Sequence, residues 1–429
     1  MRGRSAGLLL MVAAACAPGE SDWGGTERDS AGVMVVQNPP EATWRQQPEL
    51  VMELRIGDEE GDPVYRFGAV VSIDVDSAGR IHVLDRQAAQ VRVFDNAGKH
   101  VRTIGGPGAG PGELSPTTMA VLAGPDGVVY VADIMRQRIA AFDLDGREIG
   151  STPMLVQRGI PLRFNVSPDG RFLIQVRAMM LPGMLDTVPM KDRILARDPA
   201  SEQADTLLEA ESGRTFAFSG GGMPRFRLFE PEPVWAVLQD GRLAHGRNDN
   251  YRIEVLGEDG TVERVITRRV ERRAVTGADR AAILDMMRRA LERQLAGRSR
   301  QSAALAQQIV EGTQFADHYP LFAALLGGPH GTLWVQRIRT ADDAKREGST
   351  FHAQDIGSAQ WDVFDPAGRL LGMLQLPAKF QPMHVEGEHI YGVLRDELDV
   401  QHVVRLRVVG LSPHQSRSSR TRSRSRSRR

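Results

Sequence analysis

Residues 73–105 contain four short runs of alternating apolar and polar residues, separated by turns of Gly, Asp and Asn. Such alternation is typical of β-strands that bury one face, and turns this tight predict antiparallel neighbours. The stretch therefore predicts a four-stranded antiparallel meander. A single sheet of this kind cannot bury both of its faces, so further copies of it are expected elsewhere in the chain.

Five further copies follow, and the second is the clearest. Its turn Gly124–Gly127 leads into the strand Val128–Asp133 and then into Arg138–Gly146. Gly127 follows the equivalent Gly79 of the first copy by 48 residues, a typical length for one repeat of a β-propeller. The remaining copies begin near Ser167, Gln239, Gly328 and Val385.

A lone alternating run, Leu50–Gly57, precedes the first copy and closely resembles its fourth strand, His100–Gly105. A fourth strand at the beginning of a repeat array is expected to complete the last sheet of a closed ring. We therefore predict an all-β fold. It is a six-bladed β-propeller of four-stranded antiparallel blades over residues 49–410, closed by the N-terminal strand.

Residues 276–312 have a different pattern and predict a helical insertion between blades four and five. Thr276 and Asp279 have the spacing of a capping box, and Ile283, Met287 and Leu291 recur at helical spacing. Helices in long loops of a β fold are often functional. Two roles remain open for the insertion, a packing clamp across one face of the ring and a ligand lid.

The N-terminus has the form of a bacterial export signal. Residues 1–16 contain two arginines, the apolar run Leu8–Val12 and the sequence Ala13-Ala14-Ala15-Cys16. The apolar run is too short to cross a bilayer. Cys16 is the only cysteine of the chain, so it cannot form an intramolecular disulfide. Residues 17–48, rich in Gly and Pro, predict a flexible tether.

The formal net charge of zero hides two basic ends. Lys+Arg and Asp+Glu both number 54, but nine arginines lie in the leader and in the tail after Gln415. The central body is therefore acidic, which argues against a nucleic-acid partner for the folded domain. Residues 411–429 form an Arg/Ser tail that has too few apolar residues to fold alone, so we expect it to be disordered.

The first two copies resemble NHL-type repeats of six-bladed β-propellers. The matching stretches are the interblade run Gly105–Leu114 and the strands Val128–Asp133 and Arg138–Gly146. Ala13–Cys16 resembles the lipobox of bacterial lipoproteins, with Ala13 where Leu is usual. The resemblance implies lipidation of Cys16, and ordinary signal cleavage is the alternative. Ala17 in place of an inner-membrane retention Asp implies an outer-membrane or surface location.

Four charged residues share one position in the repeat and are the candidate ligand-binding residues. The residues six positions after each turn glycine are Asp85, Asp133, Val176, Arg247, Arg337 and Val393. These positions end the second strand of each blade, at the face where propellers usually bind ligands. Arg suits carboxylate or phosphate groups, and paired Asp can hold a cation or a sugar hydroxyl. The alternative for Asp85 and Asp133 is that they cap the following turns.

The sequence gives little support to catalysis. Ten histidines are scattered over different blades without the spacing of a metal motif, and we predict no catalytic residue, no metal site and no cofactor. The expected starts of the inner strands, such as Ala69–Val71 and Phe322–Ala324, are mostly apolar. Propeller lactonases and lyases place acids, Asn or His there.

These observations predict an exported, lipid-anchored propeller that acts as a non-catalytic binding or interaction scaffold in the cell envelope. Its partner would be an envelope protein, a peptide or a glycan, and we expect a monomer. The alternative is a propeller enzyme, a metal-assisted lactonase or lyase with its site at the central channel. Ca²⁺ would be its cofactor.

Overall fold

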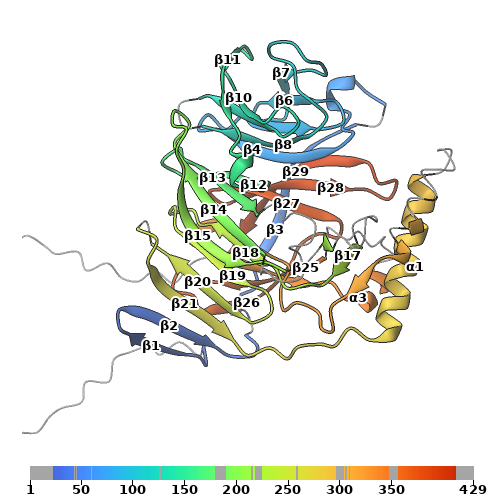
Figure 1. The fold of residues 1–429 in the computed structure, drawn as a ribbon. Coiled ribbons are helices and arrows are strands. Elements are labelled where there is room, and N and C mark those ends of the chain that lie inside the picture. Colours follow the sequence, from blue (N-terminus) through green and yellow to red (C-terminus); the bar gives the residue numbers. More distant parts are fainter. Residues whose placement is uncertain are drawn as a thin grey trace, which may run out of the picture.

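The computed structural model describes most of residues 23–411 as one ring of sheets (Figure 1). The residues within this range that it does not describe are 43, 45, 59, 125–126, 179–189, 214–215, 218–224, 258, 296–303, 305–306, 309 and 347–355. The predicted signal peptide with Cys16, and the Arg/Ser tail from residue 412, lie outside the described residues.

Six four-stranded antiparallel units confirm the predicted six-bladed propeller. The blades are, in order, β4 (Val70–Val75), β5 (Ile81–Asp85), β6 (Gln90–Phe94) and β7 (His100–Gly105); β8 (Thr118–Ala123), β9 (Val129–Asp133), β10 (Arg138–Phe142) and β11 (Glu148–Pro153); β12 (Ile160–Val166), β13 (Phe172–Arg177), β14 (Lys191–Arg197) and β15 (Asp205–Glu211); β18 (Pro233–Val237), β19 (Leu243–Arg247), β20 (Arg252–Leu256) and β21 (Val262–Arg268); β23 (Ala324–Gly327), β24 (Leu333–Ile338), β25 (Gly357–Phe364) and β26 (Leu370–Gln375); and β27 (Phe380–Glu386), β28 (His389–Arg395), β29 (Gln401–Val409) and β3 (Glu49–Ile56).

Eight hairpins of the described chain share one turn. In each, the first residue donates its amide to the carbonyl of the fifth, and a glycine at the fourth position donates to the carbonyl of the first. These glycines have φ between 75° and 87°, a conformation that glycine adopts without steric cost. The turns are 76–80, 95–99, 124–128, 143–147, 167–171, 238–242, 257–261 and 365–369. The glycine signature of the sequence is therefore a backbone requirement.

A register shift recurs between the third and fourth strands of every blade. It falls at Phe94, Phe142, Leu195, Leu256, Phe364 and Leu406. A β-bulge increases the local right-handed twist of a sheet. The repeated bulge therefore gives all six blades the extra twist that lets them pack face to face around the ring.

Apolar side chains fill the spaces between neighbouring blades. One cluster joins blades one and two through Leu84, Val91, Val131 and Phe142, and another joins blades six and one through Val83, Phe94, Tyr391 and Val403. Each blade therefore covers the face of its neighbour, which satisfies the burial that a single meander lacks.

The predicted ring closure is confirmed. β3 pairs antiparallel with β29, with Ile56 opposite Val403 and Glu49 opposite Val409. The innermost strands of blades six and one are also joined, because His384 Nδ1 of β27 lies 2.9 Å from Asp74 Oδ1 of β4. Burial lowers the pKa of His384, but the charge and hydrogen bond of Asp74 outweigh it and raise the pKa above its ordinary value.

The expectation of a flexible tether over 17–48 is wrong for much of its described part. β1 (Thr26–Ser30) and β2 (Val33–Asn38) form a hairpin, and β2 pairs in parallel with β21 at the outer edge of blade four. The hairpin lies at the lower left of Figure 1, in blue. Val36 is fully buried, so the apolar residues of this Gly- and Pro-flanked stretch belong to a strand.

The same segment then crosses the outer edges of blades five and six. The Asn38 side-chain amide donates to Gly368 O at 2.9 Å, and its Oδ1 accepts from Leu370 N at 2.6 Å. Trp44 Nε1 donates to Met373 O of β26 at 2.7 Å, and β3 follows in blade six. Residues 26–56, which we call the N-terminal belt, therefore contact three successive blades.

The predicted insertion contains the long helix α1 (Gly277–Gln294). Thr276 caps it as expected, with Oγ1 accepting from Asp279 N at 3.1 Å and Asp279 Oδ2 accepting from Thr276 N at 2.9 Å. Four further elements accompany α1, namely α3 (Ala341–Arg346), β16 (Phe216–Ala217), β17 (Arg225–Leu228) and β22 (Gln314–Phe315). Short 3₁₀ turns occupy Pro63–Tyr65, Val156–Arg158 and Pro329–Gly331.

These added elements share a core of their own. Leu228, Ile283, Met287, Tyr319 and Ala344 are buried together, and α1 contacts α3. The elements come from three separate loops, 212–232, 269–323 and 339–356. We call this group the cap. Residues 297–312 of the predicted insertion fall largely outside the described residues.

All three cap loops leave the same face of the ring. This connector face is where second strands end and where the chain passes from each fourth strand to the next blade. The opposite face, the turn face, carries loops of at most seven residues, of which 198–204 is the longest. Figure 1 shows α1 and α3 together at one side of the ring.

We predict that the belt contributes measurably to stability. Asn38→Ala should lower the free energy of unfolding by about 1–3 kcal/mol, because the buried Leu370 amide and two carbonyls lose their partner. Urea unfolding followed by tryptophan fluorescence measures it. Asn250→Ala is the control, since the Asn250 side chain is exposed and, among the described residues, is hydrogen-bonded to its neighbour Asp249. Equal free energies of unfolding for the two variants would show that the contacts of Asn38 in the belt do not stabilise the fold.

Candidate functional site

All four predicted site residues lie on the connector face at the ends of second strands, but their environments differ. The carboxylates of the two acids accept hydrogen bonds from backbone amides. Asp85 is 1% exposed and accepts from the amides of Gly68, Ala69 and Gln87 at 2.9–3.1 Å. Arg92 Nη2 lies 3.4 Å from it.

Asp133 has the same role in blade two. Its side chain is fully buried and accepts from the amide of Ser115 at 2.9 Å and from the hydroxyl of Ser115. Ser115, like Gly68 and Ala69, lies just before the first strand of its blade. Both acids therefore anchor the interblade connector that precedes their blade. Asp85 also caps the following turn through Gln87 N, as the alternative expected, whereas Asp133 is bonded to Ser115.

Arg337 is held in a buried ion cluster. Its Nε and Nη2 donate to Asp362 Oδ1 at 2.9 and 2.7 Å. Arg268 and the hydroxyl of Tyr251 donate to the other oxygen of Asp362, which is 2% exposed. The cluster joins blades four and five. About a third of the Arg337 side chain, 37%, stays exposed.

Arg247 differs from the other three residues because its guanidinium lies beyond hydrogen-bond distance of the nearest acids. Its guanidinium lies 3.7 Å from Glu211 and 3.6 Å from Asp249, beyond hydrogen-bond distance, and its buried Nε has no hydrogen-bond partner among the described residues. The side chain is 36% exposed. A buried N–H without a partner is costly, and of the four predicted residues only Arg247 has one among the described residues.

The capping position in blade four belongs to the next residue, Asn248. Its Oδ1 accepts from Glu232 N at 2.8 Å, and its Nδ2 donates to Phe322 O at 3.0 Å. Asn248 thus replaces Asp85 and Asp133 in function and leaves Arg247 outside the capping network. A fixed count from the turn glycine hides this difference.

A further charged cluster was missed by that count. Val176 and Val393, at the counted position, are buried apolar residues. β13 continues to Arg177, one residue farther. Arg177 Nε donates to Asp192 Oδ1 at 2.7 Å, and Arg177 also pairs with Glu232 of the neighbouring blade. The signal available in the sequence was the charge directly after Val176.

Glu232 has the most perturbed carboxyl on this face. Burial, together with the nearby negative charge of Asp192, raises its pKa to about 7, although Arg177 opposes the shift. Its surroundings are rigid, because Gln175 donates to Asp192 at 2.7 Å and Trp235 Nε1 donates to Gln175 at 2.8 Å. Groups with shifted pKa values cluster at functional sites, and this one borders the start of the inner strand β18.

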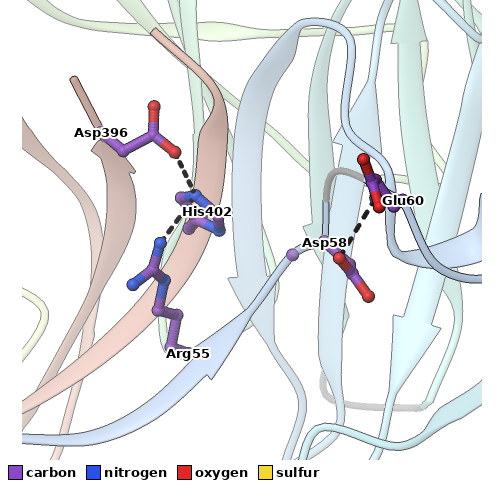
Figure 2. A pocket seen from close by; sticks show the side chains of 6 residues that line it. Arg55, Asp58, Glu60, Asp396 and His402 are labelled. Carbon is purple, nitrogen blue, oxygen red and sulfur yellow. Dashed lines mark hydrogen bonds and ion pairs between the residues drawn. The ribbon is translucent and has the colours of Figure 1, made fainter. Parts of the chain in front are cut away.

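A cavity of about 390 Å³ lies elsewhere on the connector face, between the end of β3 and the loop from β28 to β29 (Figure 2). His402 Nε2 lies 3.0 Å from Asp396 and 2.9 Å from Arg55 Nη2. The hydrogen bond from His402 lowers the pKa of Asp396. Asp58 and Glu60 form the other wall.

A pair like Asp396 and His402 also occurs in blade one, away from this cavity. His82 Nε2, at 1% exposure, lies 3.0 Å from Asp76, again six residues earlier. Each Asp also accepts the amides two and four residues after it. The arrangement is therefore a way of bracing a turn against the next strand. It does not by itself indicate catalysis.

Within the part of the chain that the structure describes, no three or more His, Cys, Asp or Glu side chains are grouped to hold a metal ion. Likewise, none of the described helices has the length and apolar character needed to cross a membrane. The connector face can therefore offer, from its described residues, guanidinium donors and one carboxyl with a raised pKa.

We predict that Glu232 makes stability depend on pH. The folded chain holds a proton on Glu232 up to about pH 7, whereas the unfolded chain loses it near the ordinary pKa of 4.5. The free energy of unfolding should therefore fall as the pH rises between these values. Glu232→Gln should flatten that fall in urea unfolding series. Glu209→Gln should leave it intact, because Lys191 and Arg193 lower the pKa of Glu209. An unchanged slope in Glu232→Gln would contradict the assignment.

Comparisons with known proteins agree with the fold. Residues 66–156 match the family described as 6-bladed beta-propeller (DUF5128). No curated protein matches the sequence.

Solved structures similar to the chain share little sequence with it. A DUF4221-family protein of Bacteroides vulgatus has a TM-score of 0.50 and 12% identity, over 84% of this chain and 98% of that one. A protein of Bacteroides fragilis, provisionally described as exported, has a TM-score of 0.48 and 11% identity over 87% and 99%. Virginiamycin B lyase of Staphylococcus aureus has 0.40 and 12% over 85% and 100%. The likeness to the DUF4221-family protein concerns the fold, at an identity too low to transfer an activity.

Proposed function

We propose that this protein is an exported, lipid-anchored propeller that acts as a non-catalytic binding scaffold of the cell envelope. Its ligand site lies on the connector face, beside Arg247, and takes an acidic ligand. Cys16 is the proposed lipidation site, and the outer membrane or cell surface is the proposed location.

The observation that carries the proposal is the asymmetry between the two faces of the ring. Every turn-face loop is short, and eight hairpins there repeat one turn. The connector face carries the three cap loops, which build a separate core. Long, structured loops on one face of a rigid scaffold are where binding residues usually lie.

Charge supports an acidic ligand. The body of the chain is acidic, yet α1 and the segment before it contain exposed arginines, including Arg272, Arg273, Arg288 and Arg289. Arg247 adds a guanidinium whose Nε has no hydrogen-bond partner within the described residues. An Arg fork matches the geometry of carboxylate and similar oxyanions.

A binding role is favoured over catalysis by how three acids of this face are engaged. Asp85 and Asp133 accept hydrogen bonds from backbone amides, and Asp362 is held by Arg268 and Arg337. A carboxylate fixed in this way is poorly placed to transfer a proton to a ligand.

We predict that Cys16 anchors the chain. Cys16→Ser removes the thiol that would carry the lipid, so the protein should move from the membrane pellet to the soluble fraction, and globomycin should block processing of the parent chain. Ala17→Asp is the matched change, which keeps the anchor and should shift the protein towards the inner membrane. Fractionation with immunodetection measures both. Membrane association of Cys16→Ser equal to that of the parent would refute the anchor.

We predict that Arg247 binds the ligand. Oligogalacturonate, a carboxylate-bearing glycan, serves as the probe in isothermal titration calorimetry. Arg247→Ala should weaken binding by about tenfold or more, the loss expected for one charge-assisted hydrogen bond. Adding Arg337→Ala to this variant should weaken probe binding further. Thermal unfolding of the double variant is measured as well, because Asp362 loses a partner.

Arg102→Ala is the control for this measurement. Arg102 has a similar exposed fraction, 30%, and pairs with Asp145 on the far blades. Absence of probe binding by the parent chain, or equal affinity of Arg247→Ala and Arg102→Ala, would count against the proposed site.

A further inference from the structure

We infer that the protein is held on the membrane by one particular rim. The rim of blades four and five, formed by the β1–β2 hairpin and the turn 365–369, faces the lipid surface, and blades one and two point away from it. The inference rests on the proposed lipid anchor at Cys16.

The first described residue, Trp23, is fixed to that rim. Its Nε1 donates to Asn38 Oδ1 at 3.1 Å, and the guanidinium of Arg369 lies over its ring at 5.5 Å from the centroid. Glu27 pairs with Arg369 at 2.6 Å. Asn38 is in turn bonded to Thr267 O of blade four and Gly368 O of blade five. The chain therefore enters the fold at a defined point on both blades.

The distance from the anchor to this point is short. Only residues 17–22 separate Cys16 from Trp23. A fully extended chain gains at most about 3.6 Å per residue, so the two Cα atoms are no more than about 25 Å apart. A lipidated Cys16 lies at the bilayer surface, and Trp23 must remain within that reach.

The order of the blades then places the rest of the ring relative to the membrane. Blades follow one another around the ring in sequence order, and β3 closes blade six onto blade one. In a ring of six, blades one and two are diametrically opposite blades four and five. In Figure 1 the β1–β2 hairpin lies at the bottom of the ring, and β7, β10 and β11 lie at its top.

The C-terminal end of the fold supports the same placement. Leu411 is buried in the cluster that contains Trp44 and Leu50 of the belt, between blades five and six. Seven arginines follow within the next eighteen residues. Basic residues close to anionic lipid headgroups are attracted to them, and this segment starts on the half of the ring that carries the anchor.

The test compares two reporter positions in the full lipoprotein, reconstituted into phosphatidylethanolamine–phosphatidylglycerol vesicles that carry a nitroxide headgroup quencher. Cys16 is the only native cysteine and is blocked by its lipid, so one added cysteine can be labelled with a fluorophore. Ser30→Cys reports from the hairpin and Ser151→Cys from the outer strand of blade two; both side chains are exposed. Quenching should be at least threefold stronger at residue 30.

A long linker provides the matched control. Inserting about thirty Gly/Ser residues between residues 22 and 23 adds a mean span of about 30 Å, so the difference between the two reporters should disappear. Failure of the parent protein to float with vesicles would remove the anchor itself and with it the proposed location. Flotation with equal quenching at the two positions would overturn the orientation alone. A difference that survives the linker would overturn the short tether as the cause of the orientation.

Discussion

The hydrogen-bonded ladder between β3 and β29 is the contact on which the rest of the structure depends. It joins Glu49–Ile56 to Gln401–Val409 and so turns six sheets into a closed ring. Each apolar cluster between blades requires both neighbours in place. The N-terminal belt extends this closure, because residues 26–56 also contact the edges of blades four and five. The N-terminal belt thus contacts the outer edges of three of the six blades.

Much of this architecture could be predicted because its signals are local. Alternating strands and the recurring turn glycine, such as Gly79 and Gly127, indicated the blades, and Leu50–Gly57 indicated closure. The β1–β2 hairpin could not be read in the same way. β2 pairs in parallel with β21, whose residues lie more than 200 positions later, and its flanking Gly and Pro suggested a linker. The cap was found only where a long helix marked it, since β16, β17 and α3 are too short to give a periodic signal.

The shared face of the four candidate residues could be predicted from the sequence, but their contacts could be predicted only in part. Counting from the turn glycine places all four on the connector face, because strand direction follows from the repeat. The chemistry at that position depends on one-residue differences between blades. In blade three the charge falls on Arg177, after buried Val176, and in blade four Asn248 takes the capping role that leaves Arg247 exposed. The raised pKa of Glu232 arises from burial between two blades, which no single repeat contains.

The belt also sets the order in which the molecule can assemble. Residues 26–56 are synthesised first, but their partners β21, β26 and β29 come later, and β29 is the last strand of the chain. Pairings this distant in sequence form slowly, because a long loop must close before any contact is gained. Until Gln401–Val409 is available, β3 has no strand to pair with. The ring therefore cannot close until the chain is nearly complete, although each of the first five blades can form its own hairpins earlier.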